Sequence, residues 1–412
     1  MKGFCLSSNF PEKGVGWLEI DKPVIENPYD AILEPVAVSP CTSDVHSAKA
    51  NISGGGAASN LILGKTGQKR PDIVLGHEAV GRVVEVGSLV KDFKPGDVVA
   101  VPCVTPNWLT LEVQDGWYMH SGGQAGGRYT SLRSHGVFGE YFRIPFADMN
   151  LARIPEGVSL AAGVMATDMI TTGFSAVEMA DVNYGDTVVV IGIGPVGLMS
   201  VAGAALRGAG RIIAIGSRPI TRELAVKYGA EVTVDYHDGD LREQLNDILG
   251  PKKADAVIIA GGNEDTVSFA MGLLHIYGRV ANLLGLSGEI LIKPSDSGAF
   301  CAHKTLVGNL CPGGRVRTER LMSIVKSGRL DADALITHEF HGLDAIEPAF
   351  DIMADKPVVS SIFRKLVCSS GMNEVSQQWR HPQQQPPDAS YSCTSYCPTG
   401  YRPHGAAGHR PA

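Results

Sequence analysis

Four side chains of metal-binding type lie in three short motifs of the 412-residue sequence. His77 and Glu78 follow the apolar run DIVL, Cys41 lies in PCTSD, and Asp168 lies in TDM. Imidazole, thiolate and carboxylate groups are all ligands that Zn²⁺ accepts. The His-Glu pair could equally be a structural pair on a turn before a strand, and sequence alone does not show whether the motifs converge in space.

A glycine-rich motif has the spacing of a dinucleotide-binding loop. It consists of Gly192, Ile193, Gly194, Pro195, Val196 and Gly197. The motif follows the apolar run TVVVI and opens the run LMSVAGAALRG, which is the strand–turn–helix context that such a loop needs. Its glycines would allow backbone amides at a helix N-terminus to approach a pyrophosphate. The alternative is an ordinary glycine turn between a strand and a helix.

The residues after the next apolar run favour one dinucleotide over the other. An NAD enzyme would place an acidic residue there to bind the ribose hydroxyls. Here RIIAIG is followed by Ser217 and Arg218, so a carboxylate is missing and a cation is present. This arrangement indicates NADP, because its 2′-phosphate needs a positive partner. The alternative is that Arg218 is an ordinary surface arginine in contact with solvent.

The elements around these motifs change character near residue 155. The first 150 residues contain short strand-like runs such as AILEPVAV and AVGRVVEVG, separated by Gly, Pro and Asp. Beyond residue 155, four apolar runs alternate with segments of helix length. These runs are 187–191, 211–216, 255–261 and 279–285. Strand followed by helix, repeated, predicts an α/β fold with a doubly wound parallel sheet.

The composition argues against several classes of protein. The net charge of −7 argues against nucleic acid or an anionic membrane as the main partner, because both attract a basic surface. Eight cysteines without framework spacing argue against a disulfide-stabilised secreted scaffold, and we expect a cytoplasmic protein. Residues 187–206 are uncharged and long enough to span a bilayer, but their clustered glycines favour a strand, a turn and a buried helix.

Two segments are expected to lie outside the packed domains. Residues 47–72 are rich in Ala, Gly, Ser and Asn, which is typical of a surface loop. Residues 369–412 are rich in Pro and Gln and poor in aliphatic side chains, so we expect a disordered tail. Cys393 and Cys397 in this tail have loose metal-like spacing, but no fold is predicted around them.

In their order, these motifs resemble the NADP-dependent, zinc-containing secondary-alcohol (isopropanol) dehydrogenases of the medium-chain dehydrogenase/reductase superfamily. The similarity rests on GHE-x2-G-x5-G-x2-V beginning at Gly76, and on the blocks MKGF, PCTSD, VFGE, GIGPVGLM, GSRP and CPGGR. It covers about residues 1–357. It implies a GroES-like, β-rich catalytic domain over 1–154, completed by 298–368, and a Rossmann domain over 155–297.

The resemblance also implies a zinc site. Cys41, His77 and Asp168 would bind one catalytic ion, with Glu78 as a fourth ligand in some states, and one position left for substrate. Aspartate in place of the more usual cysteine at the third ligand position is typical of this subgroup. Many members of the superfamily carry a second, structural zinc on four cysteines, but Cys103 is the only cysteine between residues 95 and 125. One zinc ion is therefore predicted, and no structural one.

Further roles are implied by the same resemblance. A zinc ion would polarise the oxygen of a small secondary alcohol or ketone while hydride is exchanged with the nicotinamide. Ser43 resembles the first hydroxyl of the proton relay and His46 its outer base, although a Ser and a His this close in sequence are often bystanders. Gly216, Ser217, Arg218 and Tyr236 resemble the 2′-phosphate pocket. The family also suggests a homotetramer.

Three departures from the family bear on the substrate. The loop between His46 and His77 is longer than usual, Asn282–Leu286 replaces an Asn-x-x-Tyr-like stretch, and the pocket tryptophan corresponds to Arg128. A buried arginine would need a partner or an anionic substrate, so Arg128 could instead point to solvent. The expected pocket residues are Cys103, Met169 and Leu310.

Three hypotheses follow. The first is a zinc- and NADP-dependent dehydrogenase of small secondary alcohols and ketones. The second is an enzyme of the same fold that acts on a polyol or a longer aldehyde. The third is a catalytically inactive NADP-binding protein. Such a protein is expected to have lost some of its metal ligands, whereas all four candidate ligands are present in this sequence.

Overall fold

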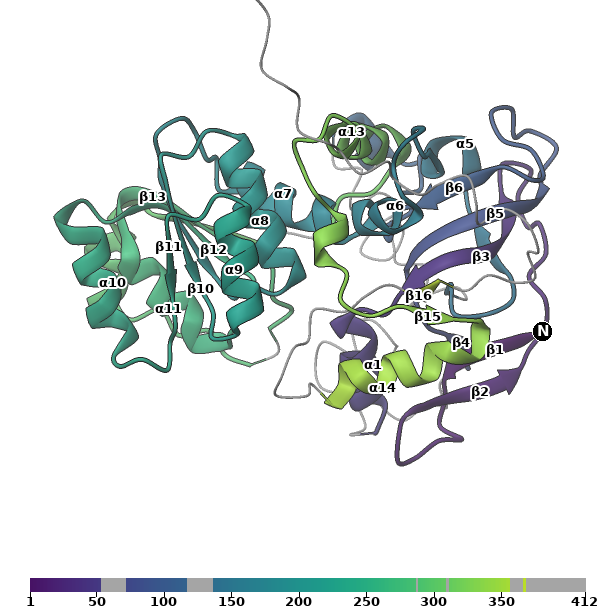
Figure 1. Ribbon diagram of the computed structural model, residues 1–412, viewed down its shortest axis with the longest axis horizontal. Coiled ribbons are helices and arrows are strands. Elements are labelled where there is room, and N and C mark those ends of the chain that lie inside the picture. The colour runs from purple at the N-terminus through teal and green to yellow at the C-terminus, as the bar shows by residue number, and fades with distance from the viewer. Residues whose placement is uncertain (53–71, 117–135, 287, 309–310, 356–365, 368–412) are drawn as a thin grey trace, which may run out of the picture. The chain divides into compact units, whose positions relative to one another are not determined.

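The computed structural model describes residues 1–52, 72–116, 136–286, 288–308, 311–355 and 366–367 (Figure 1). The chain divides into two units, residues 1–370 and 371–412, and the second lies wholly outside the described residues. Most of the expected 47–72 loop, Arg128 and Leu310 also lie outside them. Expectations about these segments therefore stay predictions.

Two sheets are built mainly from residues before 155, coloured from purple to blue in Figure 1, and two short C-terminal strands, coloured green to yellow, join the larger sheet. A three-stranded antiparallel sheet has the order β2-β1-β4, with β1 at Lys2–Leu6, β2 at Val15–Glu19 and β4 at Ile73–Val74. A seven-stranded sheet has the order β15-β16-β3-β5-β6-β8, and β7 also pairs with β3. Its strands are β3 (Ala31–Ser39), β5 (Glu78–Val86), β6 (Val98–Val101), β7 (Phe142–Ile144), β8 (Ala152–Arg153), β15 (Phe340–His341) and β16 (Leu366–Val367).

A six-stranded parallel sheet follows in the chain, and it confirms the predicted doubly wound architecture. Its order is β11-β10-β9-β12-β13-β14, so successive strands run outward from β9 and then resume on its other side at β12. Such a reversal opens a ligand crevice at the carboxyl ends of the two central strands. The strands are β9 (Thr187–Ile191), β10 (Arg211–Ile215), β11 (Val232–Val234), β12 (Ala254–Ile259), β13 (Leu274–Asn282) and β14 (Thr305–Gly308).

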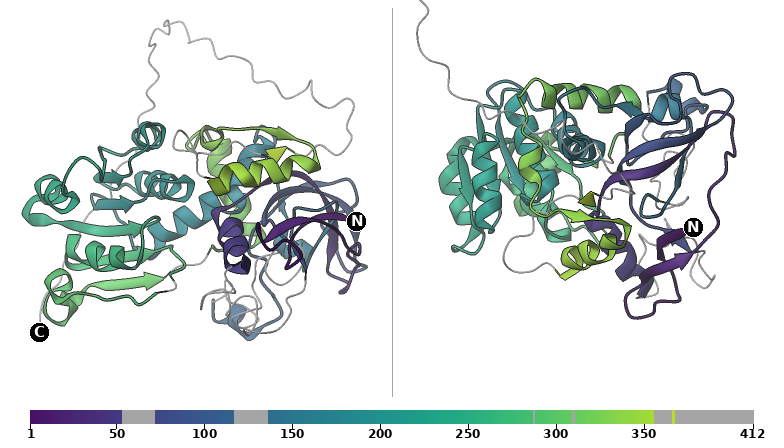
Figure 2. Two further views of the ribbon diagram at one scale, coloured as in Figure 1. Left: turned by 90° about the horizontal axis from the view of Figure 1, so that it is seen from below. Right: turned by 45° about the vertical axis from the view of Figure 1, so that its right-hand side comes forward.

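Helices cover both faces of the parallel sheet (Figures 1 and 2). Val188 and Val190 of β9 pack in one apolar cluster with α7, α8 and α9, whereas Val189 and Ile191 pack in a second cluster with α10 and α11. This alternation follows from the two-residue period of a strand. The helices in question are α7 (Met169–Met179), α8 (Pro195–Leu206), α9 (Pro219–Lys227), α10 (Leu241–Leu249) and α11 (Glu264–Leu273).

The remaining helices connect or cover the sheets. They are α1 (Thr42–Ile52), α3 (Leu111–Gln114), α5 (Ala147–Asn150), α6 (Leu160–Thr167), α12 (Pro294–Ser297), α13 (Arg315–Lys326) and α14 (Ile346–Asp355). Short 3₁₀ turns occupy Gly250–Lys252, Ala299–His303, Asp333–Leu335 and Leu343–Ala345. A separate core under the N-terminal sheets includes the fully buried rings of Phe4, Phe138, Phe142 and Phe350.

Residues 187–206 form β9, a turn and α8, as their glycine pattern predicted. Among the described residues, no single helix has both the length and the apolar character needed to cross a bilayer. The consecutive helices α6 and α7 would meet both criteria only as a pair, and the pair is bent by 42° where they meet.

A candidate metal centre and dinucleotide site

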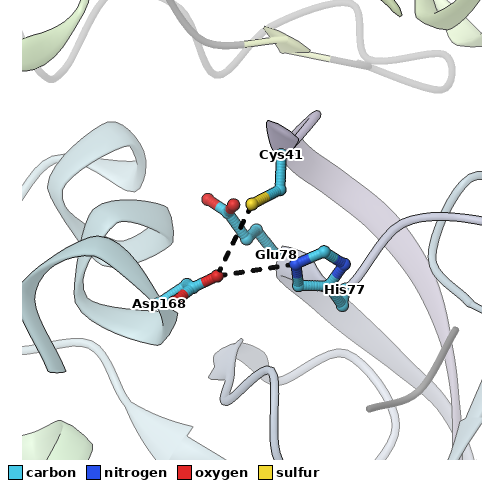
Figure 3. A group of neighbouring side chains, drawn as sticks. All are labelled: Cys41, His77, Glu78 and Asp168. Atoms are coloured by element: carbon cyan, nitrogen blue, oxygen red, sulfur yellow. Dashed lines mark hydrogen bonds and ion pairs between the residues drawn. The ribbon is translucent and has the colours of Figure 1, made fainter. Parts of the chain in front are cut away.

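The four candidate metal ligands come from three places in the fold. Cys41 lies between β3 and α1, while His77 and Glu78 lie at the start of β5. Strands β3 and β5 are antiparallel, with Ser39 opposite Glu78, so the end of one strand meets the beginning of the other. Asp168 lies at the break between α6 and α7, and its side chain points toward the other three (Figure 3).

The ligand atoms of these four residues form one compact cluster. One ligand atom from each of Cys41, His77, Glu78 and Asp168 lies within 4.8 Å of all the others. Asp168 Oδ2 is 3.9 Å from Cys41 Sγ and 3.5 Å from His77 Nε2 (Figure 3). The side chains of His77, Glu78 and Asp168 are buried, and that of Cys41 is half-buried. The structure therefore brings together residues that the sequence could name but could not place.

The electrostatics of the cluster call for a positive ion. Both carboxylate oxygens of Glu78 are buried without a hydrogen-bond partner. Burial, with the nearby charge of Asp168, raises the pKa of Glu78 well above its usual range, and burial raises the pKa of the Cys41 thiol to about 12. Uncompensated acidic groups of this kind are rare in folded proteins. A thiol, an imidazole and two carboxylates, one of them without a partner, fit a zinc ion.

Two further side chains hold the candidate ligands in place. Burial alone would raise the pKa of Asp168, but hydrogen bonds and the charge of His77, together with Thr172, lower it. Thr172 Oγ1 donates to Asp168 Oδ1 at 2.6 Å. Asp44 Oδ1 lies 3.3 Å from His77 Nδ1, and its other oxygen accepts a hydrogen bond from the backbone of Cys41 at 2.9 Å. A carboxylate behind a ligating histidine fixes the orientation of the ring.

Asp44 was missed by the sequence analysis. It belongs to the same PCTSD motif as Cys41, but nothing in the spacing shows that it contacts His77, which is 33 residues away. Burial disfavours a charged imidazole, but the carboxylates of Asp44 and Asp168 outweigh it and raise the pKa of His77 well above its usual range.

The two expected proton-relay residues lie on one face of α1. Ser43 Oγ is 3.3 Å from His77 Nε2, so this hydroxyl borders the metal cluster. His46 follows three residues later, and residues at this spacing are neighbours on a helix surface. Both side chains are exposed. The positions are compatible with a path toward solvent, and the relay role itself stays a prediction.

One expected pocket residue, Cys103, lies beside the metal cluster. Its Sγ is 2.9 Å from Cys311 Sγ, and one carboxylate oxygen of Asp168 is within 4.8 Å of both sulfurs. Met169 directly follows Asp168 and is buried. Cys311, from the block CPGGR, was recognised in the sequence only as part of the resemblance, because no spacing linked it to Cys103.

The glycine-rich loop between β9 and α8 has the conformation that its motif requires. Gly192 has φ +86°, and a Cβ there would lie 2.5 Å from the backbone of Gly261. A Cβ on Gly197 would lie 1.9 Å from the carbonyl oxygen of Gly192. A Cβ on Gly194 would meet no atom within 4 Å, so the backbone is open there. Pro195 occupies the first turn of α8, where its missing N–H costs nothing.

The four residues expected at the 2′-phosphate lie together at the ends of β10 and β11. Gly216, Ser217 and Arg218 follow β10, and Tyr236 follows β11 by two residues. Ser217 Oγ donates to Tyr236 Oη at 3.2 Å. Burial lowers the pKa of Arg218, and the nearby Tyr236 partly offsets this. Serine, arginine and tyrosine side chains at one edge of the sheet can bind a phosphate group.

Two family models match the chain. Residues 27–156 match the alcohol dehydrogenase GroES-like domain, and residues 195–327 match the zinc-binding dehydrogenase family. The chain is 50% identical to the NADP-dependent isopropanol dehydrogenase of Thermoanaerobacter brockii, an alignment that covers 87% of this chain and 97% of that protein. It is 48% identical, with the same coverage, to the NADP-dependent isopropanol dehydrogenase of Clostridium beijerinckii.

Solved structures show the same fold. The alcohol dehydrogenase TADH from Thermus sp. ATN1 aligns with a TM-score of 0.74 at 24% identity, over 89% of this chain and 99% of that one. A zinc-dependent alcohol dehydrogenase 2 from Streptococcus pneumonia aligns with a TM-score of 0.76 at 25% identity, over 90% of this chain and 100% of that one.

Proposed function

The chain belongs to the zinc-binding alcohol dehydrogenase family of the medium-chain dehydrogenases, and we propose that it transfers a hydride between NADP(H) and small secondary alcohols or ketones. The observation that carries this proposal is the buried cluster of Cys41, His77, Glu78 and Asp168 in a chain that also carries a dinucleotide loop. The high identity to two isopropanol dehydrogenases supports the substrate class.

Cys41, His77 and Asp168 would hold the zinc ion, with Glu78 as a fourth ligand in some states. When bound, the ion supplies Lewis-acid polarisation of the substrate oxygen. Asp44 would hold the ring of His77 so that Nε2 faces the cluster, and Thr172 would hold the carboxylate of Asp168. These partners would keep the ligands in place through the reaction.

The chain would also move a proton between the substrate and water. The hydroxyl of Ser43 borders the cluster and would accept the proton of the alcohol. His46, one turn further along α1 and exposed, would pass that proton to solvent or return it in the reverse reaction. The burial of His77, Glu78 and Asp168 would limit the access of bulk water to the reacting groups.

The dinucleotide would bind across the carboxyl edge of the parallel sheet. The residues from Gly192 to Gly197 would contact the pyrophosphate through backbone amides at the start of α8. Ser217, Arg218 and Tyr236, beside Gly216, would bind the 2′-phosphate. The absence of an acidic residue directly after β10 removes the group that would otherwise repel this phosphate.

Domain limits, assembly and location are part of the proposal. We place the catalytic domain at 1–154 together with the C-terminal part up to 368. The Rossmann domain would extend to about residue 308 instead of 297, because β14 pairs with β13 in the parallel sheet. We propose a homotetramer in the cytoplasm, in line with the family and with the sparse, unpatterned cysteines.

Steady-state kinetics with a panel of carbonyl compounds tests the substrate class. NADPH oxidation is measured with acetone and butanone, with a polyol-derived ketose and with a long aldehyde. We expect the largest kcat/KM for the small ketones. A larger value for the ketose or the long aldehyde would support a different enzyme of the same fold and contradict the proposal.

A further inference from the structure

A second arginine and an acidic residue lie next to the proposed 2′-phosphate site. Arg222 lies on α9, four residues after Arg218, which immediately precedes that helix in an extended conformation. Its Nη1 is 3.4 Å from Asp235 Oδ2, and its Nε donates to Thr233 Oγ1 at 3.2 Å. Thr233 lies in β11, and Asp235 lies between the end of that strand and Tyr236.

The position of Asp235 presents a problem for an anionic ligand. Its side chain is only 14% exposed, so water and salt screen its charge weakly. It directly precedes Tyr236, whose hydroxyl accepts a hydrogen bond from Ser217 at the proposed phosphate site. Its Oδ1 accepts a hydrogen bond from the backbone of His237, which fixes the carboxylate at this edge of the sheet. A fixed, poorly screened carboxylate beside a phosphate would repel it.

Arg222 has the position and the anchor needed to cancel this charge. The hydrogen bond to Thr233 directs the guanidinium along the end of β11 and toward Asp235. The ion pair removes one negative charge from the edge of the sheet, so the positive charge of Arg218 acts on the phosphate without opposition from Asp235.

We propose that Arg222 is a positioning residue for cofactor specificity, which neutralises Asp235 and thereby allows the 2′-phosphate of NADP to bind beside Tyr236. The proposal rests on the function proposed above. According to this proposal, loss of the positive charge of Arg222 alone weakens NADPH binding, whereas loss of both the Arg222 and the Asp235 charges does not. NADH lacks the 2′-phosphate, so its binding is insensitive to the pair.

The test compares the holoenzyme with the variants R222M, R222K, D235N and R222M/D235N, using KM and kcat for NADPH and for NADH. We expect R222M to raise KM for NADPH about five- to tenfold and to leave kcat and KM for NADH within about twofold. The double variant is expected to return KM for NADPH to within about twofold of the wild type, and R222K to stay near it. D235N leaves the positive charge of Arg222 unpaired, so its KM for NADPH should be no higher than that of the wild type.

Three outcomes would overturn the inference. If R222M weakens NADPH and NADH equally, Arg222 supports the fold of the site and not the phosphate. If the double variant binds NADPH as weakly as R222M, Arg222 contacts the phosphate directly. If R222M changes neither constant, the pair has no role in the cofactor site. A wild-type enzyme that prefers NADH to NADPH would instead contradict the proposed function itself, which separates the two failures.

Discussion

Asp44 contacts the imidazole of His77, with 3.3 Å between Oδ1 and Nδ1, and both side chains are almost fully buried. The same carboxylate accepts hydrogen bonds from the backbone amides of Cys41 and Gly76. One acidic side chain therefore aligns a cysteine after β3 with a histidine before β5, although the two are far apart in the sequence. The ring of His77 is left with Nε2 facing Asp168.

Replacing Asp44 should weaken metal binding without removing a ligand. D44N keeps the shape of the side chain but loses its charge, so the ring of His77 is held less firmly and becomes less basic. We expect zinc affinity to fall about 10- to 100-fold, measured by competition with a chromophoric chelator. The control is D97N, because Asp97 likewise accepts from a backbone amide three residues earlier but lies outside the cluster. Equal zinc affinity in D44N and D97N would show that Asp44 only shapes the turn.

Substitution of Glu78 should change the pH dependence of stability in the metal-free protein. Burial, together with the charge of Asp168, raises the pKa of Glu78 above its ordinary value of 4.5. The folded protein then binds this proton more tightly than the unfolded chain does. The resulting stability is fully present below about pH 4.5 and is lost as the pH rises through the folded-state pKa.

Urea unfolding of chelated protein at about pH 5 and about pH 8 measures this effect. We expect the unfolding free energy of the wild type to fall over this interval by more than that of E78Q. E85Q, which replaces an exposed carboxyl on the same strand, should behave like the wild type. Parallel pH profiles for wild type and E78Q would mean that this carboxylate is not held in an unfavourable site.

Loss of the Ser43 hydroxyl should slow catalysis more than it weakens binding. Ser43 Oγ borders His77, whereas Ser47, one turn further along α1, donates to the backbone carbonyl of Ser43. We expect S43A to lower kcat about tenfold or more, with its pH profile altered and zinc content unchanged. S47A is the matched control and should keep wild-type kcat. The relay is wrong if the two variants have the same kcat and pH profile.

Two glycines of the dinucleotide loop should respond differently to alanine. A Cβ on Gly194 meets no atom within 4 Å, so G194A should keep the melting temperature of the wild type. The added methyl group would still stand where the pyrophosphate approaches the backbone, and NADPH binding measured by fluorescence should weaken about tenfold. G197A should lower the melting temperature, because its Cβ would lie 1.9 Å from a carbonyl oxygen.

A control for this pair lies in the same domain. Gly285 also has open space around its Cβ position, so G285A should change neither property. If G194A binds NADPH as tightly as G285A does, the loop does not hold the pyrophosphate in the way proposed.

The parallel sheet could be predicted from the sequence because each of its central strands is a local run of apolar residues. Runs such as TVVVI and RIIAIG are apolar after their first residue, which matches strands buried on both faces. Each run is followed by a glycine turn and a helix. The strand β14 was not anticipated in this sheet. Its TLVG is short and half polar, and only its pairing with β13 assigns it.

The candidate site was predictable by residue type but not by geometry. The sequence shows the ligand-type side chains of Cys41, His77, Glu78 and Asp168. That these side chains lie close together was implied only by the resemblance, and the structure places one ligand atom of each within 4.8 Å of the others. Contacts such as Asp44 with His77, or Cys103 with Cys311, join segments far apart in the chain. No periodicity or spacing encodes such contacts.

The most direct test of the account follows zinc and turnover in the same sample. Acetone-dependent NADPH oxidation and metal content are measured before chelation, after chelation, and after Zn²⁺ is returned. The account predicts about one zinc per chain in the active protein. It also predicts that activity falls in proportion to the zinc removed and recovers when zinc is returned. Undiminished turnover after verified removal of zinc would contradict the central claim that the cluster around Asp168 is a catalytic metal site.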